Sequence, residues 1–599
     1  MCKHLSLLSS YDSELHWSLD LLKEFRTLIP LARKYRMHYI LGVLCLVVTN
    51  IGELYIPQLI RQSVDTISLG IFELRDIGIL VLAIVGIAAV VASARFGWRY
   101  FIQGASRNIE YDMREMIFDQ LLVLSPSFYA KMKTGDIMAR FTNDMHAVRM
   151  ASGIALVALL DGIFLTLAIL IILFTSYPLL ALYTVIPLPL ITLIILLAGK
   201  VIGRRFKRVQ EGFSRLSERV RETVSGIRVV KSFVKESYVE KLFKEQNAHY
   251  KKLNMDLIKV WGLFFPLVTF ISGLTILLLF IFGGSQVIEG TLTPGSFVAF
   301  MSYLTMLRWP VLGMGFTINI LQRGAASLSR INVILDERPD ITSPEKPLTH
   351  APSGSIRAEG VTFSYSEDAE PVLTDISFTV DAGTTLGILG RTGSGKSTLI
   401  KLIPRLLDPP PRTICIGDRD IRDYDLLRLR KSIAMIPQDT FLFSDSIKEN
   451  IAFGKPDASD DAIRLAADLS TISRELYQFP HGWDTIVGER GVTLSGGQKQ
   501  RIAISRALLL DVEYLIMDDA MSAVDSETEE AILQAVIQKR TGKTNIFVSH
   551  RVSALQHAHR ILVLDKGRII QYGSHQELVT CDGFYREIYL LQQAERRRA

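Results

Sequence analysis

Long apolar stretches alternate with basic, amphipathic ones over about the first 320 residues, and this pattern then stops. A helix needs about 20 residues to cross the hydrocarbon core of a bilayer. Apolar stretches of that kind lie near residues 38–60, 77–101, 152–175, 179–201, 260–284 and 295–320. The pattern predicts six membrane-spanning helices, followed by a domain with the mixed composition of a soluble α/β fold.

The distribution of Lys and Arg predicts how these helices are oriented. Segments 102–151 and 200–257 are rich in both residues, whereas the connections 176–178 and 285–294 contain neither. Cytoplasmic loops carry the excess of positive charge. Both termini and both basic segments are therefore expected in the cytosol, and the opposite loops are expected to be short.

The two basic segments show helical periodicity with few breakers, so they are expected to continue as helices below the membrane and turn at tips. A Pro-containing stretch after the sixth span indicates a linker. The predicted organisation is a cytosolic N-terminus with a surface-lying amphipathic helix (1–37), a transmembrane domain (38–335) with tips near 127–145 and 225–236, a linker (336–354), a nucleotide-binding domain (355–590) and a basic tail (591–599).

The C-terminal domain contains a phosphate-binding loop, GRTGSGKST, at residues 390–398. It follows a strand-like apolar run and precedes a helix, which is the context that such a loop requires. Backbone N–H groups of the glycine-rich turn can approach phosphate oxygens, and the helix N-terminus adds free donors. Lys396 supplies a positive charge, and the hydroxyl of Ser397 can ligate Mg²⁺.

Further motifs follow in a fixed order: LSGGQ at 494–498, MDDA at 517–520, SAVD at 522–525 and SHR at 549–551. With the phosphate loop, this set resembles the ATP-binding-cassette (ABC) family over about residues 355–590. Six spans joined to one cassette resemble a half-transporter of the type IV exporter fold. The resemblance implies ATP and Mg²⁺ as cofactors, and tips that act as coupling helices on the ATPase domains. The alternative for the tips is solvated cytoplasmic helices or basic faces on the membrane surface.

The resemblance also assigns roles to individual residues. Asp519, His550, Gln438 and Lys396 take the catalytic positions, and Tyr365 takes that of the aromatic residue that stacks on adenine. The remaining assignments are ATP binding (Gly390, Arg391, Thr392, Gly393, Ser394, Gly395, Lys396, Ser397, Thr398), Mg²⁺ binding (Ser397, Gln438, Asp518), the signature that meets a partner's ATP (Leu494, Ser495, Gly496, Gly497, Gln498) and a turn at the dimer interface (Ser522, Asp525).

One position departs from the family pattern. Active cassettes have Glu where this chain has Asp519, and the shorter side chain withdraws the carboxylate from the attacking water. Loss of a well-placed general base costs about 10²–10⁴-fold in rate. The combination resembles the subunit with the slow site in heterodimeric bacterial multidrug exporters. A homodimer with slow hydrolysis and a regulatory subunit that transports nothing are the alternatives.

Charged side chains inside membrane spans are costly and usually face a cavity or each other. Glu53, Asp161 and Arg308 are such residues, and they are expected either to contact a polar or cationic substrate or to form a structural ion pair. Met306 and Trp309 are further candidates for an adaptable substrate cavity, although each is equally consistent with a packing or lipid-facing role.

Composition limits the remaining possibilities. The mean hydropathy of +0.26 fits a membrane protein, and the net charge of +6 is modest. Four cysteines lack the spacing of a disulfide framework or zinc site. The six spans exclude a soluble cassette ATPase that acts on nucleic acid. The expected location is a bacterial inner membrane, with membrane lipids, a hydrophobic or amphipathic substrate and a second half-transporter as partners.

Overall fold

The computed structural model describes residues 23–68, 70, 74–366, 368–488 and 491–598. The chain forms two compact units. One comprises the residues up to 123 together with 132–337, and the other comprises residues 124–131 together with the residues from 338 onward. We refer to them as the membrane unit and the cassette unit.

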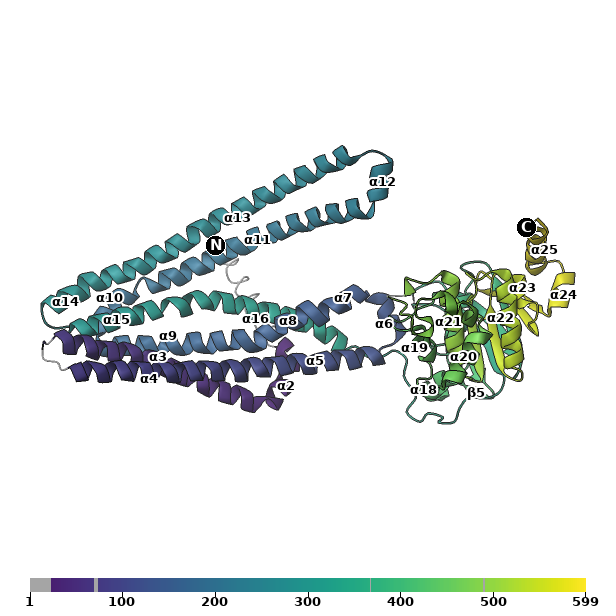
Figure 1. The fold of residues 1–599 in the computed structure, drawn as a ribbon, viewed down its shortest axis with the longest axis horizontal. Helices are drawn as coiled ribbons and strands as arrows, with labels where there is room; N and C mark the ends of the chain where they lie inside the picture. Colours follow the sequence, from purple (N-terminus) through teal and green to yellow (C-terminus); the bar gives the residue numbers. More distant parts are fainter. Residues whose placement is uncertain (1–22, 69, 71–73, 367, 489–490, 599) are drawn as a thin grey trace, which may run out of the picture. The chain divides into compact units, whose positions relative to one another are not determined.

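The membrane unit is helical throughout its described part (Figure 1). Its elements are η1 (Phe25–Thr27), α2 (Leu28–Lys34), α3 (Arg36–Ser68), α4 (Leu74–Trp98), η2 (Arg99–Gln103), α5 (Gly104–Val123), α7 (Thr134–Ala139), η3 (Arg140–Asp144), α8 (Met145–Met150), η4 (Ala151–Ala155), α9 (Leu156–Ser176), α10 (Pro178–Val185), α11 (Leu188–Ser225), α12 (Ile227–Ser232), α13 (Glu236–Leu278), η5 (Leu279–Gly283), α14 (Gly284–Ile288), α15 (Pro294–Met306) and α16 (Arg308–Leu335).

Five helical segments of the described chain are long and apolar enough to cross a membrane: Arg36–Ser68, Arg75–Val123, Thr134–Ser176, Glu236–Ile288 and Pro294–Leu335. Four of these five extend well beyond the apolar stretch that predicted them, as expected for helices that continue out of the bilayer.

The fourth predicted span, 179–201, differs from the other five. It is divided into α10 and the first part of α11, with a turn at Ile186 and Pro187 between them. Pro187 lacks a backbone N–H donor, so the helical hydrogen bond from this position is missing, which explains the interruption.

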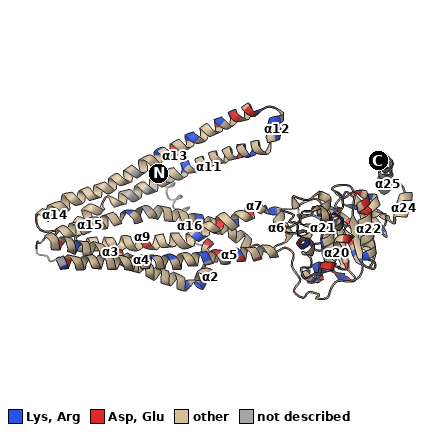
Figure 2. Cartoon of the chain, in the orientation of Figure 1, with Lys and Arg blue, Asp and Glu red and all other residues tan. Residues whose placement is uncertain are grey.

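Helices α11 and α13 pack along each other and are joined by the short helix α12, which lies within the predicted tip 225–236 (Figure 1). Charged side chains of this pair gather toward the α12 end, and the opposite ends are almost free of them (Figure 2). This distribution follows the alternation of basic and apolar stretches in the sequence.

The described part of the predicted N-terminal amphipathic helix consists of η1 and α2, whereas residues 1–22 lie outside the described residues. Lys34 at the end of α2 forms an ion pair of 2.7 Å with Asp112 of α5, and the hydroxyl of Tyr35 donates to the same carboxylate at 3.0 Å. These contacts fix the end of α2 against the helix that continues the second span.

The cassette unit contains a six-stranded and a four-stranded sheet. The six-stranded sheet has the order β10-β9-β3-β8-β7-β6 and is parallel except for its edge strand β10. Its strands are β3 (Thr385–Gly390), β6 (Ile433–Ile436), β7 (Tyr514–Asp518), β8 (Thr544–Val548), β9 (Arg560–Asp565) and β10 (Arg568–Gly573). The central strands β3, β7 and β8 are buried at every position, as is typical of parallel strands covered on both faces.

The antiparallel sheet has the order β2-β1-β4-β5. Its strands are β1 (Ile356–Phe363), β2 (Leu373–Val380), β4 (Ile414–Ile416) and β5 (Arg419–Asp420). The helices of the unit are α6 (Pro126–Lys131), α17 (Lys396–Leu402), η6 (Ile421–Asp423), α18 (Leu426–Lys431), α19 (Ile447–Ala452), α20 (Asp460–Leu469), η7 (Ile472–Gln478), η8 (Gly482–Asp484), α21 (Gly496–Leu508), α22 (Ser526–Lys539), α23 (Val552–Leu555), α24 (His575–Thr580) and α25 (Phe584–Arg598).

The last helix crosses the predicted boundary between residues 590 and 591. Helix α25 runs without interruption from Phe584 to Arg598, so the residues predicted as a basic tail continue it. Tyr585 at its start is fully buried and packs against the core of the parallel sheet.

Candidate functional site

The phosphate-binding loop connects the carboxyl end of β3 to the start of α17. Gly393 and Gly395 have φ angles of +79° and +99°, in the region where a side chain is strained. A Cβ on Gly395 would also lie 2.7 Å from Cδ2 of Leu373. The loop therefore depends on these glycines both for its turn and for its close packing.

Lys396 is folded back into this loop. Its Nζ donates to the carbonyl oxygens of Gly390 at 2.8 Å and Arg391 at 2.9 Å, and only 6% of the residue is exposed. Burial lowers the pKa of the Lys396 ammonium group, and the nearby carboxylates of Asp518 and Asp519 oppose this effect. A cation held in a glycine-rich loop at the start of a helix is suited to bind a polyphosphate.

Neighbouring side chains fit a nucleotide with its metal ion. The buried hydroxyl of Ser394 has no partner among the described residues, and Ser397 Oγ donates to Asp518 Oδ1 at 3.1 Å. Burial raises the pKa of Asp518, and the hydrogen bond from Ser397 counteracts it. A hydroxyl beside a carboxylate is a donor set that suits Mg²⁺.

Asp519 follows the end of β7 in the left-handed backbone region, with φ +48°. Its N–H donates to the carbonyl oxygen of Val548 at 2.9 Å, which holds the residue against β8. His550 comes two residues after that carbonyl group and is exposed. The ends of β7 and β8 thus bring these two predicted catalytic residues to the same edge of the sheet.

Two other predicted residues lie around this edge. Gln438 is exposed, two residues after the end of β6, the strand next to β7. Tyr365 is 59% exposed, and its hydroxyl is 3.0 Å from Oγ1 of Thr398 in the phosphate-loop helix. An exposed ring that is hydrogen-bonded beside the phosphate loop is available for stacking on a base.

The signature segment forms the start of α21. Ser495 caps this helix in a capping box with Gln498, in which each side chain bonds the other residue's backbone N–H. A Cβ on Gly497 would lie 2.9 Å from the carbonyl oxygen of Ala523, so only glycine lets the SAVD turn pack this closely.

Sequence reasoning missed the side chains that hold the signature in place. Gln500 donates to Ser522 Oγ at 3.0 Å and accepts from the Ala523 N–H at 2.9 Å, which joins the signature helix to the SAVD turn. Glu475 accepts from Gln498 at 2.8 Å and from Arg501 at 2.5 Å. Gln500 and Arg501 follow the signature directly, so the sequence contained a positional signal for them, but it contained none for Glu475.

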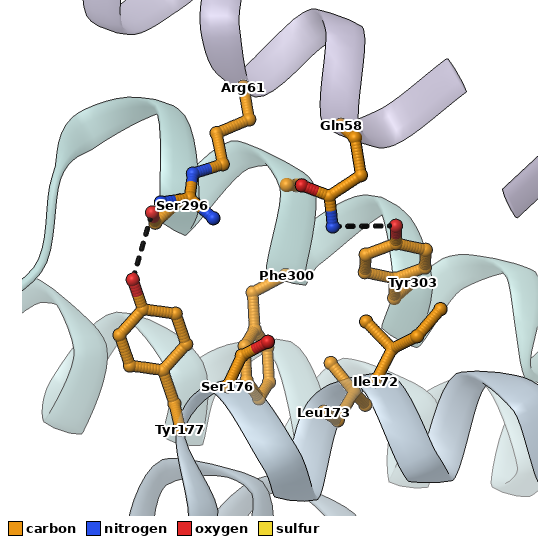
Figure 3. A pocket seen from close by; sticks show the side chains of 10 residues that line it. Gln58, Arg61, Ile172, Leu173, Ser176, Tyr177, Ser296, Phe300 and Tyr303 are labelled. Atoms are coloured by element: carbon orange, nitrogen blue, oxygen red, sulfur yellow. Dashed lines mark hydrogen bonds between the residues drawn. The ribbon is translucent and has the colours of Figure 1, made fainter. Parts of the chain in front are cut away.

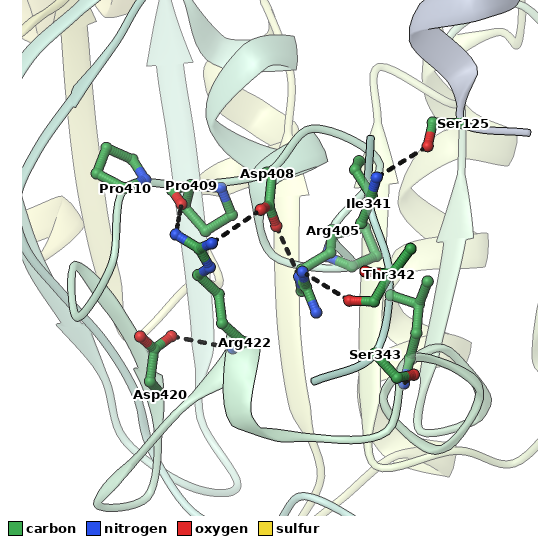
Figure 4. Close-up of polar contacts among 12 residues, drawn as sticks. Ser125, Ile341, Thr342, Ser343, Arg405, Asp408, Pro409, Pro410, Asp420 and Arg422 are labelled. Carbon is green, nitrogen blue, oxygen red and sulfur yellow. Dashed lines mark hydrogen bonds and ion pairs between the residues drawn. The ribbon is translucent and has the colours of Figure 1, made fainter. Parts of the chain in front are cut away.

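The first predicted tip, 127–145, contributes its short helix α6 to the cassette unit. The N–H of Ile341 donates to Ser125 Oγ at 3.0 Å (Figure 4). The Ser127 hydroxyl donates to Asp340 at 2.5 Å. On the other side of the same strand-like linker, the buried Arg405 donates to the carbonyl oxygen of Thr342 at 3.3 Å. The linker is therefore bonded on both sides.

Within the membrane unit, Glu53 forms an ion pair of 2.5 Å with Arg95 of α4, a residue that sequence reasoning missed. Asp161 of α9 lies close to this pair and to the buried Asn50. Arg308 forms no ion pair with a residue that the structure describes. Of the three charged residues predicted for the substrate path, Glu53 and Asp161 thus lie close together in the structure.

Met306 packs at the edge of a buried apolar cluster, whereas Trp309 is 78% exposed. A small pocket in the membrane unit has a different lining (Figure 3). Its polar side chains come from three helices and the loop before α10: Gln58, Arg61, Ser176, Tyr177, Ser296 and Tyr303. None of the five predicted cavity residues lines this pocket.

Comparisons with known proteins agree with this architecture. Residues 39–311 match the model of the ABC transporter transmembrane region, and residues 373–522 match that of the ABC transporter family. A structure of a bacterial Atm1-family ABC exporter with ATP bound is similar, with a TM-score of 0.77, 26% identity and coverage of 93% of this chain and 98% of that chain.

Curated relatives cover almost the whole chain. The chain is 39% identical to the probable multidrug resistance ABC transporter ATP-binding/permease protein YheI of Bacillus subtilis, over 94% of this chain and 96% of that protein. It is 37% identical to the multidrug resistance-like ATP-binding protein MdlA of Escherichia coli, over 94% and 95%. It is 32% identical to the ATP-dependent lipid A-core flippase of Syntrophus aciditrophicus, over 95% and 94%.

The fold prediction of a helical membrane domain joined to a nucleotide-binding domain is confirmed by these matches and by the described helices. The chain is an integral membrane protein that binds ATP and couples its hydrolysis to export, and proteins of this type act as dimers. With both parts of the architecture matched along nearly its entire length, the chain belongs to the ABC transporter family, among its exporters.

Proposed function

We propose that this chain is one half of a heterodimeric bacterial multidrug exporter, and that its own ATP site hydrolyses slowly. The observation that carries the proposal is Asp519, which stands where the sequence pattern of active cassettes has Glu. The names of two relatives, in Bacillus subtilis and Escherichia coli, refer to multidrug resistance, which supports a drug or another lipophilic substrate.

In the proposed site, Lys396 binds the β- and γ-phosphates of ATP, and the backbone donors of the glycine-rich loop bind the remaining phosphate oxygens. Ser397, Gln438 and Asp518 hold Mg²⁺, which neutralises charge on the phosphates when bound. Tyr365 stacks on the adenine. The contacts that support these roles are those of Lys396 with the loop carbonyls and of Ser397 with Asp518.

His550 contacts the γ-phosphate of ATP on this chain, and Asp519 positions the attacking water poorly. The signature, with Ser495 and its glycines, closes on ATP held by the partner cassette. The Ser495–Gln498 capping box supports this role, because it fixes free backbone donors at the start of α21. Ser522 and Asp525 lie at the dimer interface in this arrangement.

We place the chain in a bacterial inner membrane with both termini in the cytosol. The support is the charge distribution of the pair α11–α13, whose Lys and Arg residues gather at the α12 end (Figure 2). Helix α12 then acts as a coupling helix, and its exposed apolar residues Val229 and Ile227 are available to contact a cassette.

The test is the ATPase activity of the purified chain in lipid, alone and co-expressed with a Glu-bearing half-transporter. Little turnover alone and robust, substrate-stimulated turnover together would support the heterodimer. Full turnover of the chain alone would show that aspartate suffices in a homodimer. The similarity to a lipid A-core flippase is the observation that favours this alternative. ATP binding without turnover in any complex would indicate a regulatory subunit.

A further inference from the structure

The C-terminal helix α25 contacts two separate loops of the nucleotide site. Near its start, the ring of Phe584 lies under the guanidinium group of Arg391, at 5.0 Å from the ring centroid, in the phosphate-binding loop. Two turns later, Gln592 reaches the loop that carries His550. Helices α25 and α23 pack against each other at this point (Figure 1).

Gln592 uses both ends of its side-chain amide. Its Nε2 donates to the carbonyl oxygen of His550 at 2.9 Å, and its Oε1 accepts from the N–H of Val552 at 2.8 Å. Val552 is the first residue of α23, and its N–H has no partner within that helix. Arg551 at the N-cap supplies no side-chain acceptor, so Gln592 caps the helix from another element.

The backbone on both sides of His550 is held, whereas its ring is left free. The N–H of Ser549 donates to the carbonyl oxygen of Ile388, and Arg551 forms an ion pair of 2.5 Å with Glu529. The exposed His550 ring itself has no hydrogen bond to any residue that the structure describes. Within the described part of the chain, Gln592 supplies the one side-chain hydrogen bond to the backbone of His550 itself.

We propose that Gln592 is a positioning residue, which holds the His550 loop so that the imidazole reaches the γ-phosphate of ATP bound to this chain. The inference rests on the role of His550 in the proposed function and deepens it. An amide side chain can donate and accept at the same time, whereas a carboxylate only accepts and a lysine only donates. Helix α25 can do this since Tyr585 anchors it, fully buried and hydrogen-bonded through its hydroxyl to His575 at 2.7 Å.

The test measures how long ATP stays on this chain in the assembled transporter. The complex is loaded with 8-azido-ATP and Mg²⁺, chased with ATP and then illuminated, and labelling of this chain is followed after electrophoresis. Two neutral hydrogen bonds are together worth about a ten-fold factor in an equilibrium. We expect Gln592→Ala to shorten retention of the analogue about ten-fold.

Gln593→Ala is the matched control. Gln593 is the adjacent glutamine of the same helix, but its amide donates to the Tyr589 hydroxyl at 3.1 Å, within α25. We expect this variant to retain the analogue as the unmodified chain does. Equal losses in the Gln592 and Gln593 variants would overturn the proposal, because they would reflect general destabilisation of α25.

Gln592→Glu separates the two contacts and guards against a misfolded alanine variant. Its carboxylate still accepts from Val552 but faces the His550 carbonyl oxygen without a donor. Retention close to that of the unmodified chain would overturn the proposal, and a loss like that of alanine would support it. His550→Ala serves as the reference: if it shortens retention while both Gln592 variants do not, this inference alone fails, and if it has no effect, the proposed role of His550 fails first.

Discussion

Replacement of Asp519 by Glu adds one methylene and moves the carboxylate outward from β7. The backbone there is held by the hydrogen bond from the Asp519 N–H to Val548, and the preceding Asp518 is only 3% exposed. The added length is therefore expected to project into the site. A well-placed general base contributes about 10²–10⁴-fold in rate. This factor corresponds to about 3–5 kcal/mol of activation free energy.

The same substitution has a small cost in stability. Asp519 has φ +48°, and Asp adopts this left-handed region more readily than longer side chains, because its short polar group can bond locally. We expect Asp519→Glu to lower the free energy of unfolding by about 1 kcal/mol or less. A shift in Tm of a few degrees would follow, which is too small to obscure a gain in activity.

The assay is single-turnover hydrolysis of labelled ATP bound to this chain, in the purified complex with its partner. We expect the Glu variant to convert bound ATP to ADP at least 100-fold faster than the unmodified chain. Asp519→Asn, which removes the charge at nearly the same volume, should leave the slow rate almost unchanged. A large loss on Asp519→Asn would refute the reasoning, since aspartate would then be an active base. An unchanged rate in a folded Glu variant would also refute it.

Three further substitutions have defined outcomes. Lys396→Ala should weaken ATP binding to this chain about 10–100-fold, because a charge-assisted contact is lost, and unchanged binding of labelled ATP would contradict its role. Gly497→Ala places a Cβ 2.9 Å from the Ala523 carbonyl oxygen, so turnover of the complex should fall while ATP binding to this chain's phosphate loop is retained. Arg405→Ala removes the 2.7 Å hydrogen bond to Asp408, which keeps Arg422 at 3.5 Å, and should cost about 1.5–3 kcal/mol, seen as a lower Tm; an unchanged Tm would show that the pair contributes nothing.

The residues proposed for the nucleotide site lie in short contiguous motifs, so their local backbone geometry could be predicted from the sequence. The loop around Lys396 and the capping box at Ser495 each require particular residues at fixed spacing, and their backbone geometry follows from those residues. Tyr365 was assigned to the site through the family pattern alone, and its contact with Thr398, 33 positions away, was not predicted.

Contacts between distant segments could not be predicted from spacing. Gln592 bonds the backbone at His550 across 42 residues, and Arg95 pairs with Glu53 from a neighbouring helix. Each is an ordinary polar residue of a helix in the sequence, and only the packing of two helices gives it a partner. For the same reason, Arg308 was named together with Glu53 and Asp161 as a candidate only because each is a charged residue inside a predicted span.

Contacts of the linker also decide which residues belong to each of the two compact units. By composition, residues 336–354 are a linker, and the first tip was predicted to belong to the membrane domain. The structure instead includes residues 124–131 and the chain from 338 onward in one compact unit. Two hydrogen bonds account for this, from Ile341 to Ser125 and from Arg405 to the adjacent Thr342 (Figure 4). Because Arg405 is 3% exposed and fixed in the cassette, a displacement of the cassette carries the linker and α6 with it.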